Sequence, residues 1–523
     1  MTQAITGDRV TSGETQTSPV YLVKGQMAQW RYPDPQKRLT PEFARKIRDM
    51  NLSERGSADV RRGYAKYNDT VLAGPEAVVG LNETNYPSYG VQRLVCTPTK
   101  VYTDDGTTRQ DITNGATWTP TQDERVQFAY LDRKVFMDDG SDQVHTWSGD
   151  ATTPANIVAL TGMPWTLLKG GMVVHRGLLV GLRPTEGGAD EITRIRWSDI
   201  NRVTMESDTT TWPGNNRTEI DEGGVPIVGG LANWGRLWVF KEDGVHSGRV
   251  IMQVGRFEYE FLEELHGFEP ISKLGLIARP DFLFCPSREG IMVIRPDLSI
   301  ENVTRDNQSE WRDLNEGRLQ YSVAWLRQRD KQVRLLCSSD TNTSGHDLVA
   351  VWDWETGAFW FDTPTDNMNY AARAVVDNEE IDWLGSSAGW LQKGNATGAT
   401  DDDGTEIEWE VDMSPNDLEL PGRRKFIIAM RVWIKQKTGA QNFDVWVELD
   451  QGKQASVKSS LTGGVTQEYN TGLQYNIGLK YEGGTNLQLS IFVNRLAELV
   501  APKFFGTDSI ELVGYDVEWQ PIE

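Results

Sequence analysis

The sequence is poor in the residues that build disulfide frameworks and zinc sites. It has three cysteines, Cys96, Cys285 and Cys337, which are far apart and odd in number. Its five histidines are scattered, with no His-x-His or His-x-x-x-His spacing. We therefore expect no disulfide framework, no metal and no cofactor, and synthesis in a reducing cytoplasm.

Long apolar runs and helical patterns are also scarce. No apolar run approaches the length of a membrane span, and the first residues lack the basic head and apolar stretch of a signal peptide. After residue 60, no helical pattern of about 10–15 residues separates the apolar runs, which excludes a parallel βαβ sheet. We expect an all-β chain with neither a membrane span nor a signal peptide.

Positive charge is the scarcer sign, because 53 Lys and Arg face 75 Asp and Glu, for a net charge of −22. Residues 31–66 are the exception, with ten Lys and Arg against five Asp and Glu. Such a segment is suited to docking on an acidic partner or to contacting DNA phosphates, although a solvated surface is the simpler interpretation. The candidate docking residues are Arg45, Lys46, Arg48, Arg61 and Arg62.

The N-terminal segment carries a helix-start pattern. Thr-Pro-Glu at residues 40–42 places a capping residue before a proline, and Phe43 and Ile47 lie at i, i+4 spacing. The sequence predicts a short helix within an N-terminal arm and docking segment, residues 1–59.

From residue 60 onward the apolar pattern has a period of two. Asp-Gly turns at residues 104–106 and 138–140 separate alternating runs, a strong hairpin signal. A polar turn followed by an apolar strand then recurs at intervals of about 40–60 residues, the length of a propeller blade. Six such units predict a β-propeller of about six blades over residues 60–400. They begin near Leu131, Val174, Asn233, Pro280, Arg329 and Glu379.

The pattern changes after the acidic run at residues 401–404. Strands become longer and Gly-rich turns separate them, which predicts an antiparallel β-sandwich-like domain over residues 401–523. The acidic run itself is interpreted as a solvated linker, with a hard-cation site as the alternative.

Two features offer functional alternatives to a structural role. The residues Gly385–Gly389 match the Gly-x-Ser-x-Gly nucleophile elbow, but no helix pattern follows, so we expect a hairpin turn. The chain holds 19 Trp, which are interpreted as core, with an exposed sugar-binding cluster as the alternative. No catalytic residue is assigned.

One stretch resembles a known family. The segment Arg194–Ile200 is an expected strand that ends in Trp-Ser-Asp-Ile. A polar loop then leads to a second tryptophan, Trp212, which is followed by a proline. Gly229–Leu231, the strand Leu237–Lys241, Gly267–Ser272 and Arg288–Ile291 follow, and Asn51–Tyr64 precedes them. This order of features, over roughly residues 50–300, is similar to that of the tail nozzle, or packaged-DNA-stabilisation, proteins of short-tailed phages.

The resemblance implies a structural protein of the virion tail, assembled in the bacterial host cytoplasm, and not an enzyme. It implies a ring of identical subunits, sixfold in the family, that contacts the portal adaptor and other tail proteins. Viral DNA would pass through an acidic lumen without sequence-specific binding, and loops 201–216 and 340–346 are the candidate gates. The alternative is a tail-associated propeller protein that binds or cleaves host surface polysaccharide.

Overall fold

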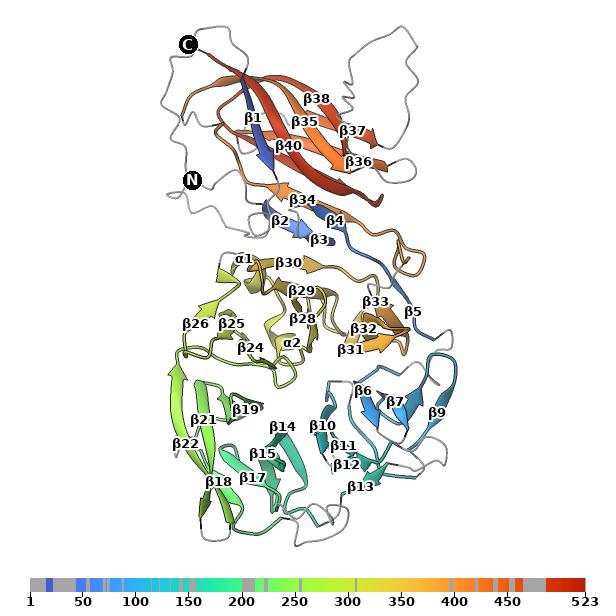
Figure 1. The fold of residues 1–523 in the computed structure, drawn as a ribbon, viewed down its shortest axis with the longest axis vertical. Helices are drawn as coiled ribbons and strands as arrows, with labels where there is room; N and C mark the ends of the chain where they lie inside the picture. The colour runs from blue at the N-terminus through green and yellow to red at the C-terminus, as the bar shows by residue number, and fades with distance from the viewer. Residues whose placement is uncertain are drawn as a thin grey trace. The chain divides into compact units, whose positions relative to one another are not determined.

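A computed structural model gives the fold of the chain (Figure 1). It describes residues 16–21, 44–52 and 57–522, except 69–71, 73–75, 87–88, 114, 122, 132, 141–143, 150–156, 161, 200–211, 221–223, 254–255, 306–307, 395–397, 419–421, 436–440, 451–456 and 464–485. The chain divides into two compact units. The first unit comprises Met1–Arg62, Trp354–Asp362 and Gly404–Glu523, and the second comprises Gly63–Asp353 and Thr363–Asp403.

The second unit consists of seven antiparallel sheets, here numbered I to VII in chain order. Sheet I contains β6 (Gly80–Tyr86), β7 (Gly90–Cys96), β8 (Val101–Asp104) and β9 (Arg109–Asp111). Sheet II contains β10 (Gln127–Leu131), β11 (Lys134–Asp138), β12 (His145–Trp147) and β13 (Val158–Ala159). Sheet III contains β14 (Leu167–His175), β15 (Leu178–Glu186), the short β16 (Ala189–Asp190), β17 (Arg194–Trp197) and β18 (Arg217–Glu219).

The remaining four sheets follow the same meander order. Sheet IV contains β19 (Ile227–Asn233), β20 (Arg236–Lys241), β21 (Gly244–Gln253) and β22 (Arg256–His266). Sheet V contains β23 (Ile277–Arg279), β24 (Phe282–Ser287), β25 (Gly290–Ile294) and β26 (Ile300–Asn302). Sheet VI contributes β27 (Ala324–Arg327), β28 (Gln332–Cys337) and β29 (Leu348–Asp353) to this unit. Sheet VII contains β31 (Met368–Val376), β32 (Glu379–Ser386), β33 (Leu391–Gly394) and β5 (Tyr64–Lys66).

Turn chemistry defines the first hairpin of several sheets. The turns Arg176–Gly177, Trp234–Gly235 and Asp377–Asn378 each place two consecutive residues at positive φ. Two-residue turns of this kind match the right-handed twist of the strands that they join. The hairpins are therefore encoded locally, one sheet at a time.

Shared apolar cores join successive sheets from sheet I to sheet V. One core combines residues of sheets I and II, such as Leu94 and Val135, and a second combines residues of sheets III and IV, such as Val180 and Val239. The first strands of successive sheets contact one another from sheet II to sheet VII, and β31 contacts β6. The seven sheets thus follow one another around a closed circuit (Figure 1).

The first unit contains two further sheets. One holds β3 (Met50–Leu52), β4 (Ala58–Val60), β40 (Glu511–Pro521), β35 (Lys425–Lys435) and β38 (Asn486–Ala497), and β1 (Gln16–Tyr21) pairs with β40. The other holds β30 (Ala358–Asp362), β2 (Ala44–Arg48), β34 (Trp409–Met413), β39 (Val500–Gly506), β36 (Gln441–Leu449) and β37 (Val457–Gly463). Phe504 and Tyr515, both buried, bring the sheets into contact with ring centroids 5.8 Å apart.

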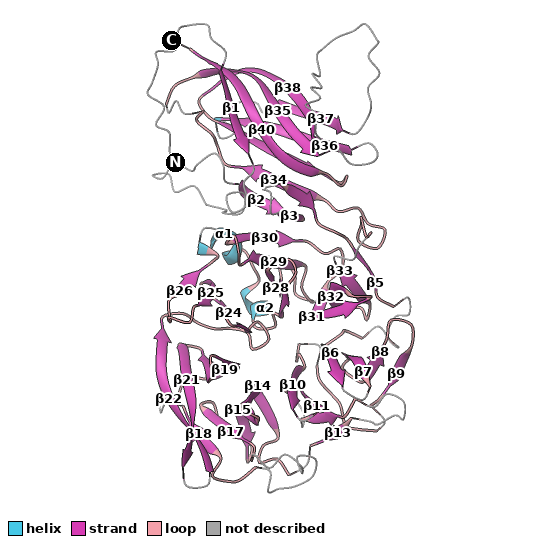
Figure 2. Ribbon diagram, in the orientation of Figure 1, coloured by secondary structure: helices cyan, strands magenta, loops and turns pink. Residues whose placement is uncertain are grey.

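The all-β prediction is confirmed. The helices among the described residues are α1 (Gln308–Arg312) and α2 (Glu316–Leu319), between sheets V and VI (Figure 2). The six predicted repeat units correspond to sheets II to VII, because each contains the first hairpin turn of one sheet. A count of six is not confirmed, since sheet I repeats the same order of strands.

The predicted N-terminal helix is wrong. Residues 40–43 lie outside the described residues, and Ala44–Arg48 form strand β2. This strand pairs antiparallel with β34 and parallel with β30, and its register shifts between Ala44 and Lys46. Ala44 and Ile47 are buried by this packing. Pairing with strands more than 300 residues away overrides the local helical spacing.

Candidate functional site

Three of the candidate docking residues lie on β2, and two of them, Lys46 and Arg48, are engaged within the first unit. Lys46 binds Glu410 at 2.8 Å, and Lys503 binds the other oxygen of that carboxylate at 2.6 Å. Burial alone would raise the pKa of Glu410, but the hydrogen bonds from the two lysines outweigh it and hold the pKa below its usual value. Arg48 lies over the ring of Phe361, 5.1 Å from its centroid.

Of the remaining candidates, Arg61 is buried and Arg62 is exposed. Arg61 is 2% exposed, and its Nε donates to Asp49 Oδ1 at 2.6 Å, an ion pair that water does not reach. The side chain of Arg45 lies outside the described part of the structure. The sequence therefore grouped a buried structural arginine with an exposed one, because charge patterning does not report burial.

The acidic run at residues 401–404 lies beside the strand that completes sheet VII. Strand β5 pairs with β33, although more than 300 residues separate them in the chain. The buried Asp402 accepts hydrogen bonds from the amide of Tyr64 at 3.0 Å and from Thr365 Oγ1 at 3.1 Å. Any Cβ at Gly63 would lie 1.7 Å from the carbonyl oxygen of Asp401. The buried Asp402 thus holds β5 in place through hydrogen bonds, so the acidic run is not only a solvated linker.

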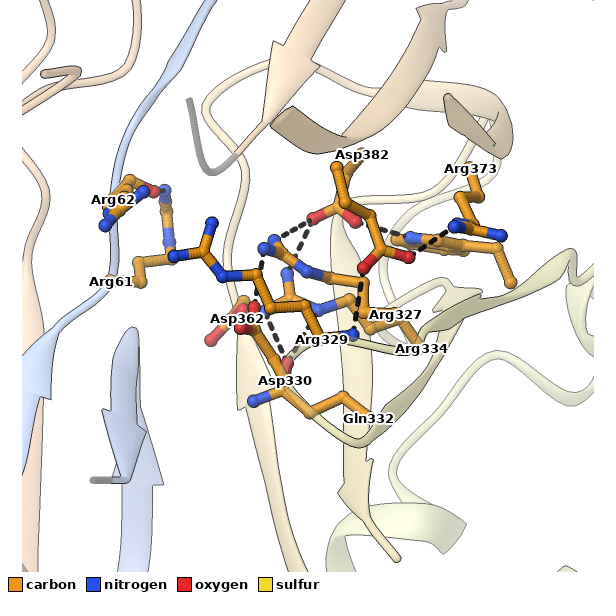
Figure 3. A network of polar contacts seen from close by, with 12 residues as sticks. Arg61, Arg62, Arg327, Arg329, Asp330, Gln332, Arg334, Asp362, Arg373 and Asp382 are labelled. Atoms are coloured by element: carbon orange, nitrogen blue, oxygen red, sulfur yellow. Dashed lines mark hydrogen bonds and ion pairs between the residues drawn. The ribbon is translucent and has the colours of Figure 1, made fainter. Parts of the chain in front are cut away.

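A buried polar network joins sheet VI to sheet VII (Figure 3). Asp382 on β32 accepts hydrogen bonds from Trp325 Nε1 at 2.7 Å, Arg334 Nη1 at 2.9 Å and Arg327 Nη1 at 3.2 Å. The Nε and Nη2 atoms of Arg334 also bind the side-chain oxygen of Gln332. Asp382 and Arg334 are fully buried, so the network acts through matched charge and geometry.

A second carboxylate on β32, that of Glu380, also contacts sheet VI. Glu380 accepts the backbone amides of Gln328 and Arg329, in the turn between β27 and β28, at 3.0 and 2.9 Å. Its Oε1 also lies 2.5 Å from Arg373 Nε. Glu380 and Asp382 share a strand face because side chains on a strand alternate. Two carboxylates on one strand thus hold the neighbouring sheet.

The nucleophile-elbow match is a hairpin turn. Strand β32 ends at Ser386, β33 begins at Leu391, and the two pair with Gly385 opposite Leu391. The Ser387 amide donates to the carbonyl of Asn367. No helix follows the turn, so the strand-turn-helix context of an elbow is missing here.

Two buried histidines, His175 and His346, make structural contacts. His175 contacts Tyr259, with Nδ1 3.0 Å from the hydroxyl, and burial lowers the pKa of His175. His346 is fully buried, with Nδ1 2.9 Å from Ser338 Oγ and Nε2 3.1 Å from the carbonyl oxygen of Tyr321. In the described part of the chain, no three His, Cys, Asp or Glu side chains are grouped so that they could hold a metal ion.

The two predicted gate loops have different outcomes. Most of loop 201–216 lies outside the described residues. Loop 340–346 is tied down at both ends: His346 exchanges two backbone hydrogen bonds with Met368, and Asn342 binds Asn315 and Asn367. A loop held by this many contacts has little freedom to open.

Tryptophan forms much of the core, as predicted. The sequence places eight tryptophans in or beside expected strands; six of them are buried, and Trp234 and Trp354 are partly buried. The six are Trp197, Trp212, Trp238, Trp352, Trp360 and Trp383. The most exposed tryptophan of the described residues is Trp446. Its ring packs edge-on against that of Phe505, with the ring centroids 5.2 Å apart. The described surface thus shows no cluster of exposed Trp side chains.

Comparison with known proteins adds no identity. The sequence matches no protein-family model, and a search of curated proteins gave no match. No helix among the described residues is long and apolar enough to span a membrane.

Proposed function

We propose that this chain is a structural subunit of a phage tail, a nozzle protein whose identical copies form a ring around the DNA exit path. The sequence resemblance suggests the family. The closed circuit of sheets, completed by β5, is the structural observation that carries the proposal. A fold hosts many functions, so the assignment has to be tested on the assembly itself.

The second unit is assigned as a seven-bladed propeller. Six of the blades contain a four-strand meander, sheet VI contributes three strands to this unit, and the strand β5 from the N-terminal side of the unit closes the last blade. Closing a ring of sheets in this way protects the sheet edges at the seam. The first unit, with its two packed sheets, is assigned as a β-sandwich.

Charge supports a channel-forming role. Each subunit carries a formal net charge of −22, so a ring of copies is strongly acidic. A wall that repels phosphates does not hold a moving duplex, whereas a basic wall binds it. The adaptor-docking role falls to the exposed Arg62, since Arg61 is buried against Asp49.

The proposal is tested by the mass and the activity of the full-length protein. A ring has a mass of several times the 58.8 kDa chain, six times in the family arrangement. Native mass spectrometry of tail complexes is expected to show it. A monomer that cleaves host surface polysaccharide would replace the nozzle assignment with the enzyme alternative.

A further inference from the structure

A buried cation without a hydrogen-bond partner among the described residues lies just before the first strand of sheet II. Arg125 lies two residues before β10 and is 2% exposed. None of its three guanidinium nitrogens has a hydrogen-bond partner among the described residues. A buried, unpaired cation costs on the order of several kcal/mol, so folded proteins supply a counter-charge or neutralise the group.

A second guanidinium lies nearby. Arg318 on α2 binds Asp123 through Nη1 at 2.7 Å, and its guanidinium lies over the ring of Tyr321, 4.9 Å from the centroid. Its Nε and Nη2 are buried and have no hydrogen-bond partner among the described residues. The charge of Arg318 lowers the pKa of Arg125, and both charges lower the pKa of His346. Arg125 lies two residues after Asp123, the ion-pair partner of Arg318, so the two arginines share one electrostatic environment.

The charges in this environment do not balance. Burial lowers the pKa of Arg125 to about 9, so the group stays protonated at neutral pH. Burial and the two arginine charges lower the pKa of His346 to about 3, so it is neutral there. Among the described residues, Asp123 is the carboxylate that pairs with Arg318 and acts on Arg125, and it is half-exposed. Two guanidinium charges thus share this one carboxylate.

We propose that Arg125 and Arg318 bind a small inorganic anion of the chloride class between their unpartnered N–H groups. Guanidinium nitrogens are donors only, so the group that satisfies them must accept hydrogen bonds. The unpartnered nitrogens are shielded from solvent, which favours a small ion, and the excess charge favours a single negative charge.

The two arginines come from segments that are far apart in the chain. Arg125 lies on the connection between sheets I and II, and Arg318 on the connection between sheets V and VI. Asp123 already binds Arg318 across this distance. A bound anion would strengthen that link and add stability to the circuit of sheets.

The first test is a chloride titration of the full-length protein at constant ionic strength, with sodium gluconate as the replacement salt. A ligand that binds only the folded state raises the unfolding midpoint as its concentration exceeds the dissociation constant. We expect a rise of about 3 °C or more between 1 and 100 mM chloride. The variant Arg125→Met is expected to lose this dependence.

The matched control is Arg288→Gln. Arg288 is exposed and also contacts α2, through Glu316 at 3.0 Å, so its loss perturbs the same helix from outside. This variant is expected to retain the full chloride response. A response unchanged in Arg125→Met, or absent from the wild-type protein, would overturn the proposal.

A second readout does not depend on any variant folding. Crystals grown with bromide in place of chloride are expected to show an anomalous peak within hydrogen-bonding distance of the Arg125 guanidinium. A water molecule or a protein group at that position, with no anomalous peak, would refute the anion site.

Discussion

Arg334 and Asp382 form an ion pair from which water is excluded: Nη1 lies 2.9 Å from Oδ2, and neither side chain is more than 1% exposed. The two residues belong to neighbouring sheets, VI and VII. Arg327 and Trp325 bind the same carboxylate, so one aspartate satisfies three donors. The junction between these sheets therefore depends on this buried charge together with that of Glu380.

Asp382→Asn is expected to destabilise the protein by about 3 kcal/mol, because it leaves two buried guanidinium groups without their shared counter-charge. Equilibrium denaturation in urea measures the change. The control is Asp281→Asn, which removes an exposed ion pair with Arg279 and is expected to cost less than about 1 kcal/mol. Equal costs for the two variants would show that the buried network contributes nothing special.

Asp402→Ala is expected to loosen the closing strand. It removes the acceptor for the Tyr64 amide and for Thr365, at a cost of about 1–2 kcal/mol. Hydrogen exchange at residues 64–66 is expected to accelerate. Asp403→Asn is the control, because it neutralises an exposed contact with Lys66 and keeps a residue type that tolerates the positive φ at this position. Unchanged exchange in Asp402→Ala would argue against a role for Asp402 in holding β5.

His346 predicts a specific loss of stability in acid. Burial and two arginine charges lower its folded pKa from 6.5 to about 3, so below pH 6.5 the unfolded chain binds a proton that the folded chain does not. This contribution to stability is complete above pH 6.5 and is lost at up to about 1.4 kcal/mol per pH unit as pH falls toward 3.

The variant His346→Gln is expected to remove that part of the slope, and His266→Gln, at an exposed position, is expected to retain it. Urea denaturation between pH 7 and pH 4 gives both slopes. Parallel curves for wild type and His346→Gln would contradict the assignment.

The docking residues separate into two classes that mutation can distinguish. Arg61→Ser is expected to destabilise the first unit by about 3 kcal/mol, because it breaks the buried pair with Asp49. Arg62→Ser is expected to leave stability unchanged and to weaken attachment to the portal adaptor several-fold at low salt, less at high salt. Salt-dependent co-sedimentation measures attachment. Attachment that does not change in Arg62→Ser would remove Arg62 from the docking surface.

Local turn chemistry explains why the strands could be predicted from the sequence. The Asp-Gly turns at residues 104–106 and 138–140 do follow strands β8 and β11, because short-range backbone preferences define them. The turn after β8 in sheet I was predicted, but the sheet was not counted as a repeat unit, although Gly90 and the apolar run Leu94–Cys96 carry the same signal.

Long-range pairing explains most of what could not be predicted. Strand β2 has a helical spacing of apolar residues but pairs with β30 and β34, and β5 completes a sheet whose other strands begin at Met368. The Arg125 site also depends on contacts between distant segments, since Asp123 and Arg318 are 195 residues apart. No local pattern reports such pairings.

We propose that this chain forms the ring of a phage tail nozzle, and cryo-electron microscopy of tails isolated from particles that encode the chain would show such a ring. We expect a closed ring of identical copies, six by family resemblance, around the DNA path, with an acidic inner surface. A chain that is absent from the tail, or present as single copies away from the DNA path, would contradict it.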